Sequence, residues 1–323
     1  MAVSTAPPED LFKPNTEAIK ALDTGFTWFA RIGATFAAGV LLLISLSVAL
    51  QAMPAFQEFG PGFIFKNIWN PVEDEYGAAL YIYGTLMTAL LSLVVAIPFG
   101  FGTAIFLSED FIPPRIRLAL TIIVELLAAI PSVVFGIWGL YIFIPAARPI
   151  QMWFFTHFRW IIFFSTPPTG PNLLTCGLVI GILITPIVVS ISREVLVAVP
   201  SELRDGALSM GATRWETLFG VVLPKALGGL LGALVLGLGR AMGETMAAAL
   251  LIGNSRRISA SIFAPSSNIP ALLANEFNEA EGFQIAALMY AAFILLVMTL
   301  LVNVGAEYLV RRVQRSLSAS ADI

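Results

Sequence analysis

The stretch DGALSMGATRWETLFGVVLP, residues 205 to 224, lies between two long apolar runs and mixes charged with apolar side chains. Its charged residues, Asp205 and Arg214 among them, are interleaved with leucine, methionine and aromatic residues, as in a helix that rests on a membrane surface. Gly211 followed by Thr213 predicts the end of one short helix and the capped start of the next. We therefore expect a bent amphipathic segment on which a partner protein would apply force.

The composition indicates that lipid surrounds most of the chain. Hydrophobic residues make up 58% and charged residues 12% of the 323 residues, whereas a soluble domain has about 25% charged residues. The net charge of −3 gives no broad basic surface for nucleic acid. Cys176, the one cysteine in the sequence, excludes an internal disulfide.

Six apolar stretches are long enough to span the hydrocarbon core, which takes about 20 residues. They cover residues 26–53, 78–107, 118–145, 173–199, 225–253 and 283–310. Residues 154–165 are rich in aromatic side chains, but the segment is too short to span the membrane and includes His157 and Arg159. We therefore expect it at the membrane interface. The sequence thus predicts an all-α polytopic membrane protein with six transmembrane helices. Its transmembrane domain is expected at residues 26–310, with tails at residues 1–25 and 311–323.

Lysine and arginine predict the orientation, because cytoplasmic loops carry an excess of them. With both termini inside, twelve of the 18 lysines and arginines lie on the cytoplasmic side and five outside. The outer five are Lys66, Arg148, Arg159, Arg256 and Arg257. This bias places a coupling loop, residues 201–224, in the cytoplasm between helices four and five. The N-terminal tail lacks the basic region of a signal peptide and is expected to be a mostly disordered cytoplasmic extension.

Three predicted helices contain an internal proline, namely Pro98, Pro131 and Pro186. Each proline removes a backbone hydrogen bond, so these helices are expected to face other helices or a cavity. Proline alone does not separate a fixed kink from a hinge.

Helix five carries two charges, Arg240 and Glu244, in an otherwise apolar and glycine-rich stretch. A central arginine costs about 2.5 to 3.5 kcal/mol on insertion scales. The i, i+4 spacing puts both side chains on one helical face, where Arg240 would bind an oxyanion through its planar donors. Glu244 would hold that arginine or accept a proton from the oxyanion. The alternative is a buried ion pair that only fixes helix packing.

Other charged residues have weaker functional readings. Arg256 and Arg257 follow the outer end of helix five, where they would concentrate an anion at an entrance, although solvated loop arginines are common. Glu125 in helix three either pairs with a basic residue, caps a polar cavity or serves packing. The chain contains no GxxxxGK[ST] nucleotide-binding loop, so ATP hydrolysis would need another subunit.

Several motifs resemble one family of transport proteins. The loop with Asp205, Gly206, Ala207 and Gly211, ending in Leu223–Pro224, resembles the EAA loop of ABC importer permeases, with Asp205, Gly206 and Val221 replacing its glutamate, first alanine and isoleucine. Three further stretches are similar to the permease subunits of the phosphate-specific ABC importer, most of all to the PstC type. They are IPFGFGTAIFLSE (97–109), ELLAAIPSVVFGIWGL (125–140) and GRAMGETMA (239–247).

The resemblance implies a type I ABC importer in which this chain is a non-catalytic permease in the cytoplasmic membrane of a prokaryote. Its partners would be a PstA-type second permease, a PstB-type ATPase dimer that binds ATP and Mg²⁺, and a PstS-type phosphate-binding protein outside. Arg240 and Glu244 match the charged pair that the family associates with phosphate passage. The residues implied in ATPase coupling are Glu202, Asp205, Gly206, Ala207, Gly211 and Trp215.

Three other functions stay open or are disfavoured. A permease for another oxyanion, such as sulfate or molybdate, also fits Arg240. A passive channel or a membrane scaffold would not need the coupling loop. An intramembrane enzyme would need a nucleophile with a base, or a metal cluster, whereas the one histidine lies in a predicted outer loop and Cys176 has no evident partner.

Overall fold

The computed structural model describes the backbone of residues 16–321 and the side chains of residues 24–312. The chain divides into two compact units, residues 1–50 and 51–323. Helix α1 (Thr16–Phe59) begins in the first unit, so the predicted N-terminal tail is wrong for residues 16–25, where EAIKAL is a run of good helix formers. Residues 1–15 of that tail lie outside the described residues. At the other terminus, α13 (Phe283–Ala321) continues through the predicted tail to residue 321.

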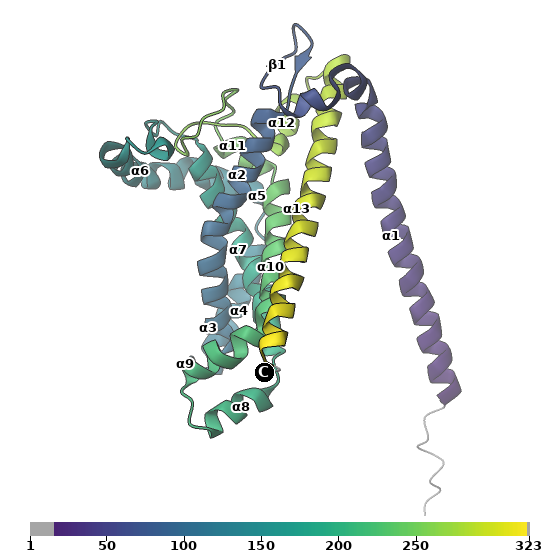
Figure 1. The fold of residues 1–323 in the computed structure, drawn as a ribbon, viewed down its shortest axis with the longest axis vertical. Coiled ribbons are helices and arrows are strands. Elements are labelled where there is room, and N and C mark those ends of the chain that lie inside the picture. Colours follow the sequence, from purple (N-terminus) through teal and green to yellow (C-terminus); the bar gives the residue numbers. More distant parts are fainter. Residues whose placement is uncertain (1–15, 322–323) are drawn as a thin grey trace, which may run out of the picture. The chain divides into compact units, whose positions relative to one another are not determined.

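Six helical segments of the described chain are long and apolar enough to cross a membrane, as the sequence predicts. They are Thr24–Ile64, Ala79–Ser108, Ser132–Phe158, Leu173–Val197, Arg214–Gly243 and Phe283–Arg312. Within the second unit, α2 (Ala79–Val95), α3 (Phe101–Ser108), α7 (Leu173–Val197), α10 (Leu223–Gly243) and α13 run lengthwise, as Figure 1 shows. One end of this bundle carries α8 (Ser201–Ser209) and α9 (Arg214–Thr217), and the other carries α6 (Ile144–Phe158) and α12 (Ile269–Glu276).

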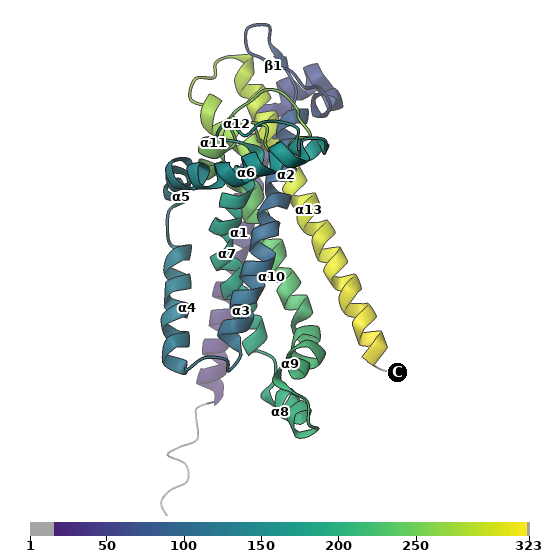
Figure 2. The same cartoon turned by 90° about the vertical axis from the view of Figure 1, so that its left-hand side faces the viewer.

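The predicted third helix, residues 118–145, is wrong as a single element. It is divided into α4 (Pro114–Ala128), α5 (Ser132–Trp138), a π-helical turn (Gly139–Phe143) and the start of α6. The break falls at Pro131, which has no N–H to donate and adopts an extended backbone with φ −58° and ψ 138°. In Figure 2, α4 runs lengthwise and α6 crosses the end of the bundle.

The transverse helix α6 includes part of the segment predicted at the membrane interface. Gln151 on its inner face is buried and donates a hydrogen bond to Thr175 Oγ1 on α7, 3.0 Å away. Trp153 is exposed, and the imidazole of His157 lies against its ring, with the centroids 4.8 Å apart. His157 is therefore an aromatic neighbour, as expected. A short 3₁₀ turn, Ile162–Phe164, follows.

Helix α7 forms the centre of the bundle and packs against α2, α3, α4 and α10. Small residues permit this packing, since helices in lipid associate through close contact rather than through the hydrophobic effect. A Cβ on Gly181 would lie 2.7 Å from the carbonyl oxygen of Ser92, so α2 would have to move away. The internal prolines differ in effect, because Pro98 lies in a π-helical turn (Ala96–Gly100), whereas α7 continues as an α-helix through Pro186.

A small aromatic cluster closes the α6–α12 end. It surrounds a hairpin of two short antiparallel strands, β1 (Trp69–Asn70) and β2 (Glu75–Tyr76), which is the one departure from the all-α prediction among the described residues. A 3₁₀ turn, Gly60–Ile64, precedes the hairpin, and its Phe63 is buried and stacks on Tyr290 of α13 with ring centroids 4.5 Å apart. Loop, hairpin and α13 are thereby packed together at this end.

Candidate functional site

The coupling segment, residues 201–224, forms the bent amphipathic unit that the sequence predicts. Helix α8 ends before Gly211, whose φ of +91° is a left-handed conformation that favours glycine. Thr213 then caps α9 through a reciprocal pair of hydrogen bonds with Glu216. A π-helical turn, Leu218–Val222, leads into α10.

The coupling segment exposes much of its apolar surface. Met210 is 89% exposed and Trp215 58% exposed. Leu203, Leu208 and Phe219 are exposed as well. Adjoining exposed apolar side chains of this size mark a surface that a partner covers. Of the predicted coupling residues, Glu202, Asp205, Gly206 and Gly211 are also exposed, and Ala207 is partly buried.

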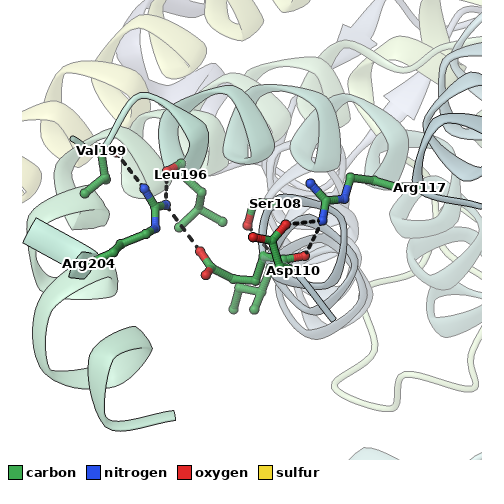
Figure 3. Close-up of polar contacts among 8 residues, drawn as sticks. Ser108, Asp110, Arg117, Leu196, Val199 and Arg204 are labelled. Carbon is green, nitrogen blue, oxygen red and sulfur yellow. Dashed lines mark hydrogen bonds and ion pairs between the residues drawn. The ribbon is translucent and has the colours of Figure 1, made fainter. Parts of the chain in front are cut away.

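A turn formed by Glu109, Asp110 and Phe111 lies against the coupling segment (Figure 3). This turn joins α3 to α4. The guanidinium of Arg204 on α8 forms an ion pair with Glu109, with Nη2 3.3 Å from Oε1. Arg117 on α4 donates to the Glu109 carbonyl oxygen at 3.1 Å and to Asp110 Oδ1 at 2.6 Å.

Helix α9 contacts the same turn. Arg214 Nη1 donates to the carbonyl oxygen of Asp110 at 3.0 Å, and the ring of Phe111 stacks on Trp215 with centroids 5.2 Å apart. The hydrogen bond from Arg117 holds the pKa of the Asp110 carboxyl below its usual range. Both short helices of the coupling segment therefore contact one three-residue turn.

Sequence reasoning did not assign a role to this turn. Glu109 is the last residue of the family-like stretch 97–109. Arg204 enters the sequence analysis as one of the twelve lysines and arginines predicted on the cytoplasmic side. The sequence does contain a signal: an acidic pair directly follows an apolar helix, and the coupling segment carries basic residues of the opposite charge. Pairing across about a hundred residues does not follow from such a signal, because opposite charges on exposed loops are common.

Arg240 and Glu244 do not share a helical face. Helix α10 ends at Gly243, and Glu244 has an extended backbone with φ −68° and ψ 118° before α11 (Met246–Leu251) begins. The prediction of a continuous fifth helix to residue 253, with the two charges paired at i, i+4, is therefore wrong. Among the described residues no ion pair joins Arg240 to Glu244.

The two residues lie in different environments. Arg240 is exposed, while Glu244 is only 7% exposed and its Oε1 accepts a hydrogen bond of 3.4 Å from the backbone N–H of Ala247 in α11. The positive end of a helix stabilises a carboxylate at that position. Glu244 thus stabilises the start of α11 and does not neutralise the charge of the Arg240 guanidinium.

A groove lies between α10 and α13. It has a volume of about 860 Å³, and Leu236 and Gly239 of α10 are on its wall, whereas Arg240 is not among its lining residues. Asn303 of α13 approaches Gly239 closely. A Cβ added at Gly239 would lie 3.3 Å from the side-chain amide nitrogen of Asn303, so a larger residue would crowd it. The buried Oδ1 of Asn303 has no hydrogen-bond partner among the described residues.

The two arginines after the predicted fifth helix differ. Arg256 donates to the carbonyl oxygen of Trp69 at 3.1 Å and pairs with Glu276, with Nη2 2.9 Å from Oε1. Glu276 compensates the charge of Arg256, which argues against anion collection by this residue. Arg257 is exposed, and anion collection stays a prediction for that residue alone.

Glu125 lies beside a small cavity near the α8–α9 end. The cavity has a volume of about 30 Å³, and Arg193 and Glu194 of α7 share its lining. The Nε of Arg193 is buried and, within the part of the chain that the structure describes, has no hydrogen-bond partner. Of the alternatives for Glu125, the position favours capping of a polar cavity.

A family model described as "Binding-protein-dependent transport system inner membrane component" matches residues 96–315, more than half of the chain. The chain belongs to this family. The matched region includes the Glu109–Phe111 turn, the coupling segment, Arg240 and the groove. Family membership and six candidate membrane helices identify the chain as a multi-pass membrane protein.

Relatives of known name extend over nearly the whole chain. The phosphate transport system permease protein PstC of Haemophilus influenzae is 39% identical over 302 residues, which are 90% of this chain and 96% of that protein. The probable phosphate transport system permease protein PstC of Methanocaldococcus jannaschii is 34% identical and covers 83% of this chain and 87% of its own length.

The fold is that of an ABC importer permease. A chain of a bacterial alginate ABC transporter, in complex with a periplasmic protein that binds an alginate pentasaccharide, has a TM-score of 0.59. The two are 16% identical, and the similarity covers 91% of this chain and 97% of that chain. The resemblance to type I importer permeases, predicted from the motifs, is confirmed at the level of the fold.

Proposed function

We propose that this chain is a transmembrane permease subunit of an ATP-driven importer of inorganic phosphate. The observation that carries the proposal is the 39% identity over 302 residues to a phosphate transport system permease. The coupling loop alone is typical of importers for many solutes. The similarity to this relative covers 96% of its length and therefore extends well beyond that loop.

The importer would contain a PstA-type second permease, a PstB-type ATPase dimer and a PstS-type phosphate-binding protein. ATP and Mg²⁺ would bind to the ATPase, since the sequence lacks a GxxxxGK[ST] loop. The exposed apolar side chains of the coupling segment, Met210 and Trp215 foremost, support ATPase docking there. In this arrangement the α8–α9 end faces the cytoplasm, together with both termini.

Phosphate would pass Arg240 on its way through the membrane. A guanidinium offers paired N–H donors that match phosphate oxygens, and the Arg240 side chain is exposed. Glu244 follows the end of α10 and, among the described residues, forms no ion pair with Arg240. In its other expected role, Glu244 would accept a proton from a protonated phosphate oxygen when α11 shifts.

Substrate competition in proteoliposomes tests this function. The complete importer, reconstituted with its binding protein, is given labelled phosphate with a hundredfold excess of unlabelled sulfate or molybdate. We expect uptake to persist under both competitors and to be abolished by unlabelled phosphate. Uptake of labelled sulfate or molybdate in place of phosphate would contradict the assignment and support a permease for that oxyanion.

A further inference from the structure

The turn of Glu109, Asp110 and Phe111 joins two helices of the bundle, α3 and α4, to the coupling segment. It follows α3 directly and leads into α4 within five residues. Its contacts with α8 and α9 come from residues 95 and 104 positions further along the chain. These contacts are not needed to close the α3–α4 connection itself, so they have a different role.

Arg204 fixes one side of this arrangement. Its Nη1 donates to the carbonyl oxygen of Val199 at 2.7 Å, and its Nη2 donates to that of Leu196 at 2.8 Å (Figure 3). Leu196 lies in the last turn of α7 and Val199 two residues beyond its end, so Arg204 ties α8 to the end of α7. The ion pair with Glu109 then adds α3, and both side chains are only about a fifth exposed, at 20% and 18%.

Helix α9 adds a second connection that does not depend on Arg204. The Arg214 side chain reaches the Asp110 carbonyl oxygen, and the stacked rings of Phe111 and Trp215 lie 5.2 Å apart. Arg117 in the first turn of α4 binds the turn from its other side. The turn is therefore bound by α4, α8 and α9 at once.

We propose that Glu109 is a positioning residue for energy coupling, through which movement of α8 and α9 is transmitted to α3 and α4. This proposal rests on the proposed function, since it presumes an ATPase on the coupling segment. The covalent chain from α9 through Pro224 moves α10, while the Glu109–Phe111 turn moves the α3–α4 hairpin in the same step. Helix α10 and the α3–α4 hairpin both pack against α7, so one movement of the coupling segment would reach both of them.

The test compares phosphate transported per ATP hydrolysed in proteoliposomes that hold the complete importer. Glu109→Ala removes the carboxylate, and Phe111→Ala removes the ring stack without touching the ion pair. An ion pair contributes about 1 kcal/mol, and an aromatic stack contributes about as much, so we expect each variant to lower the ratio roughly fivefold. The ATPase should co-purify as with wild type, because the exposed docking surface is unchanged.

Glu194→Gln is the matched control. It also removes one carboxylate at the α8–α9 end, and among the described residues the Glu194 side chain forms no ion pair. Its ratio should equal that of wild type. Glu109→Gln keeps the shape and a hydrogen-bond acceptor for Arg204, so its ratio should fall between those of wild type and Glu109→Ala.

Two results would overturn the proposal. One is an unchanged ratio in assembled Glu109→Ala; if that variant does not assemble, unchanged ratios in both Glu109→Gln and Phe111→Ala have the same meaning. The other is loss of the ATPase from the purified variants, which would make the turn part of the docking surface. Failure of the proposed function would be visible separately, as absence of phosphate uptake by the wild-type importer.

Discussion

Arg240 and Glu244 stand four residues apart in the sequence, yet the end of α10 separates them. Glu244 is buried against the first turn of α11, and Arg240 is exposed. Helical periodicity predicts one face for both, and the extended backbone at Glu244 removes that periodicity. Under the proposed function, Arg240 would be the cation available to a passing anion, while Glu244 accepts a hydrogen bond at the start of α11.

Replacing Arg240 by alanine should abolish most phosphate uptake without preventing assembly. A hydrogen bond to a charged group contributes about 1.5–3 kcal/mol, so the uptake rate should fall between roughly tenfold and a hundredfold. Arg240→Lys should recover only part of the rate, because an ammonium group lacks the paired donors. Initial uptake rates and the yield of complex are the measurements.

The control for this prediction is Arg148→Ala. Arg148 is an exposed arginine on α6, and its loss should leave uptake close to wild type. Equal uptake by wild type and Arg240→Ala, with the complex intact, would instead mean that Arg240 has a structural role.

The elements of the coupling segment follow from local chemistry. Gly211 and the pair Thr213 and Glu216 predict a bend and a capped helix, and both are present. Such features depend on residues close together in the chain, which is why the sequence is sufficient to predict them.

Gly211→Ala should weaken attachment of the ATPase. At φ +91° a side chain costs about 1–2 kcal/mol, which favours an opened bend and lowers the affinity of the ATPase for the complex by roughly tenfold. Titration of the purified ATPase onto the permease pair in lipid measures this affinity.

Gly102→Ala serves as the comparison for Gly211→Ala. Gly102 lies within α3, and a Cβ there would meet nothing within 4 Å, so its variant should bind the ATPase like wild type. Unchanged affinity in Gly211→Ala would show that the bend does not determine docking.

The prolines show where local reasoning about elements is insufficient. Pro186 lies in α7, and the helix continues through this proline. In the most apolar part of α7, 61% of the residues are buried. Pro131 follows α4, which has no buried residue among those described, and the chain turns there. Neighbouring helices hold α7 together across its proline. The sequence around either proline does not contain that information.

At the scale of the whole molecule, composition and apolar runs were sufficient for the class of protein and for six membrane helices. The contacts that join distant segments were not predictable in the same way. Arg204 meets Glu109, and Arg256 meets Trp69 and Glu276, each through packing that a single sequence does not specify. Motif similarity nevertheless identified the family, because the motifs lie within the matched region.

The central claim is that ATP hydrolysis outside this chain drives phosphate through it. The most direct measurement is the initial rate of phosphate uptake into proteoliposomes that contain both permeases and the ATPase, with loaded binding protein outside and ATP inside. We predict uptake against a phosphate gradient that stops when ATP, the binding protein or this chain is left out. Phosphate flux that runs only down its gradient and continues without ATP would contradict the account and indicate a passive channel.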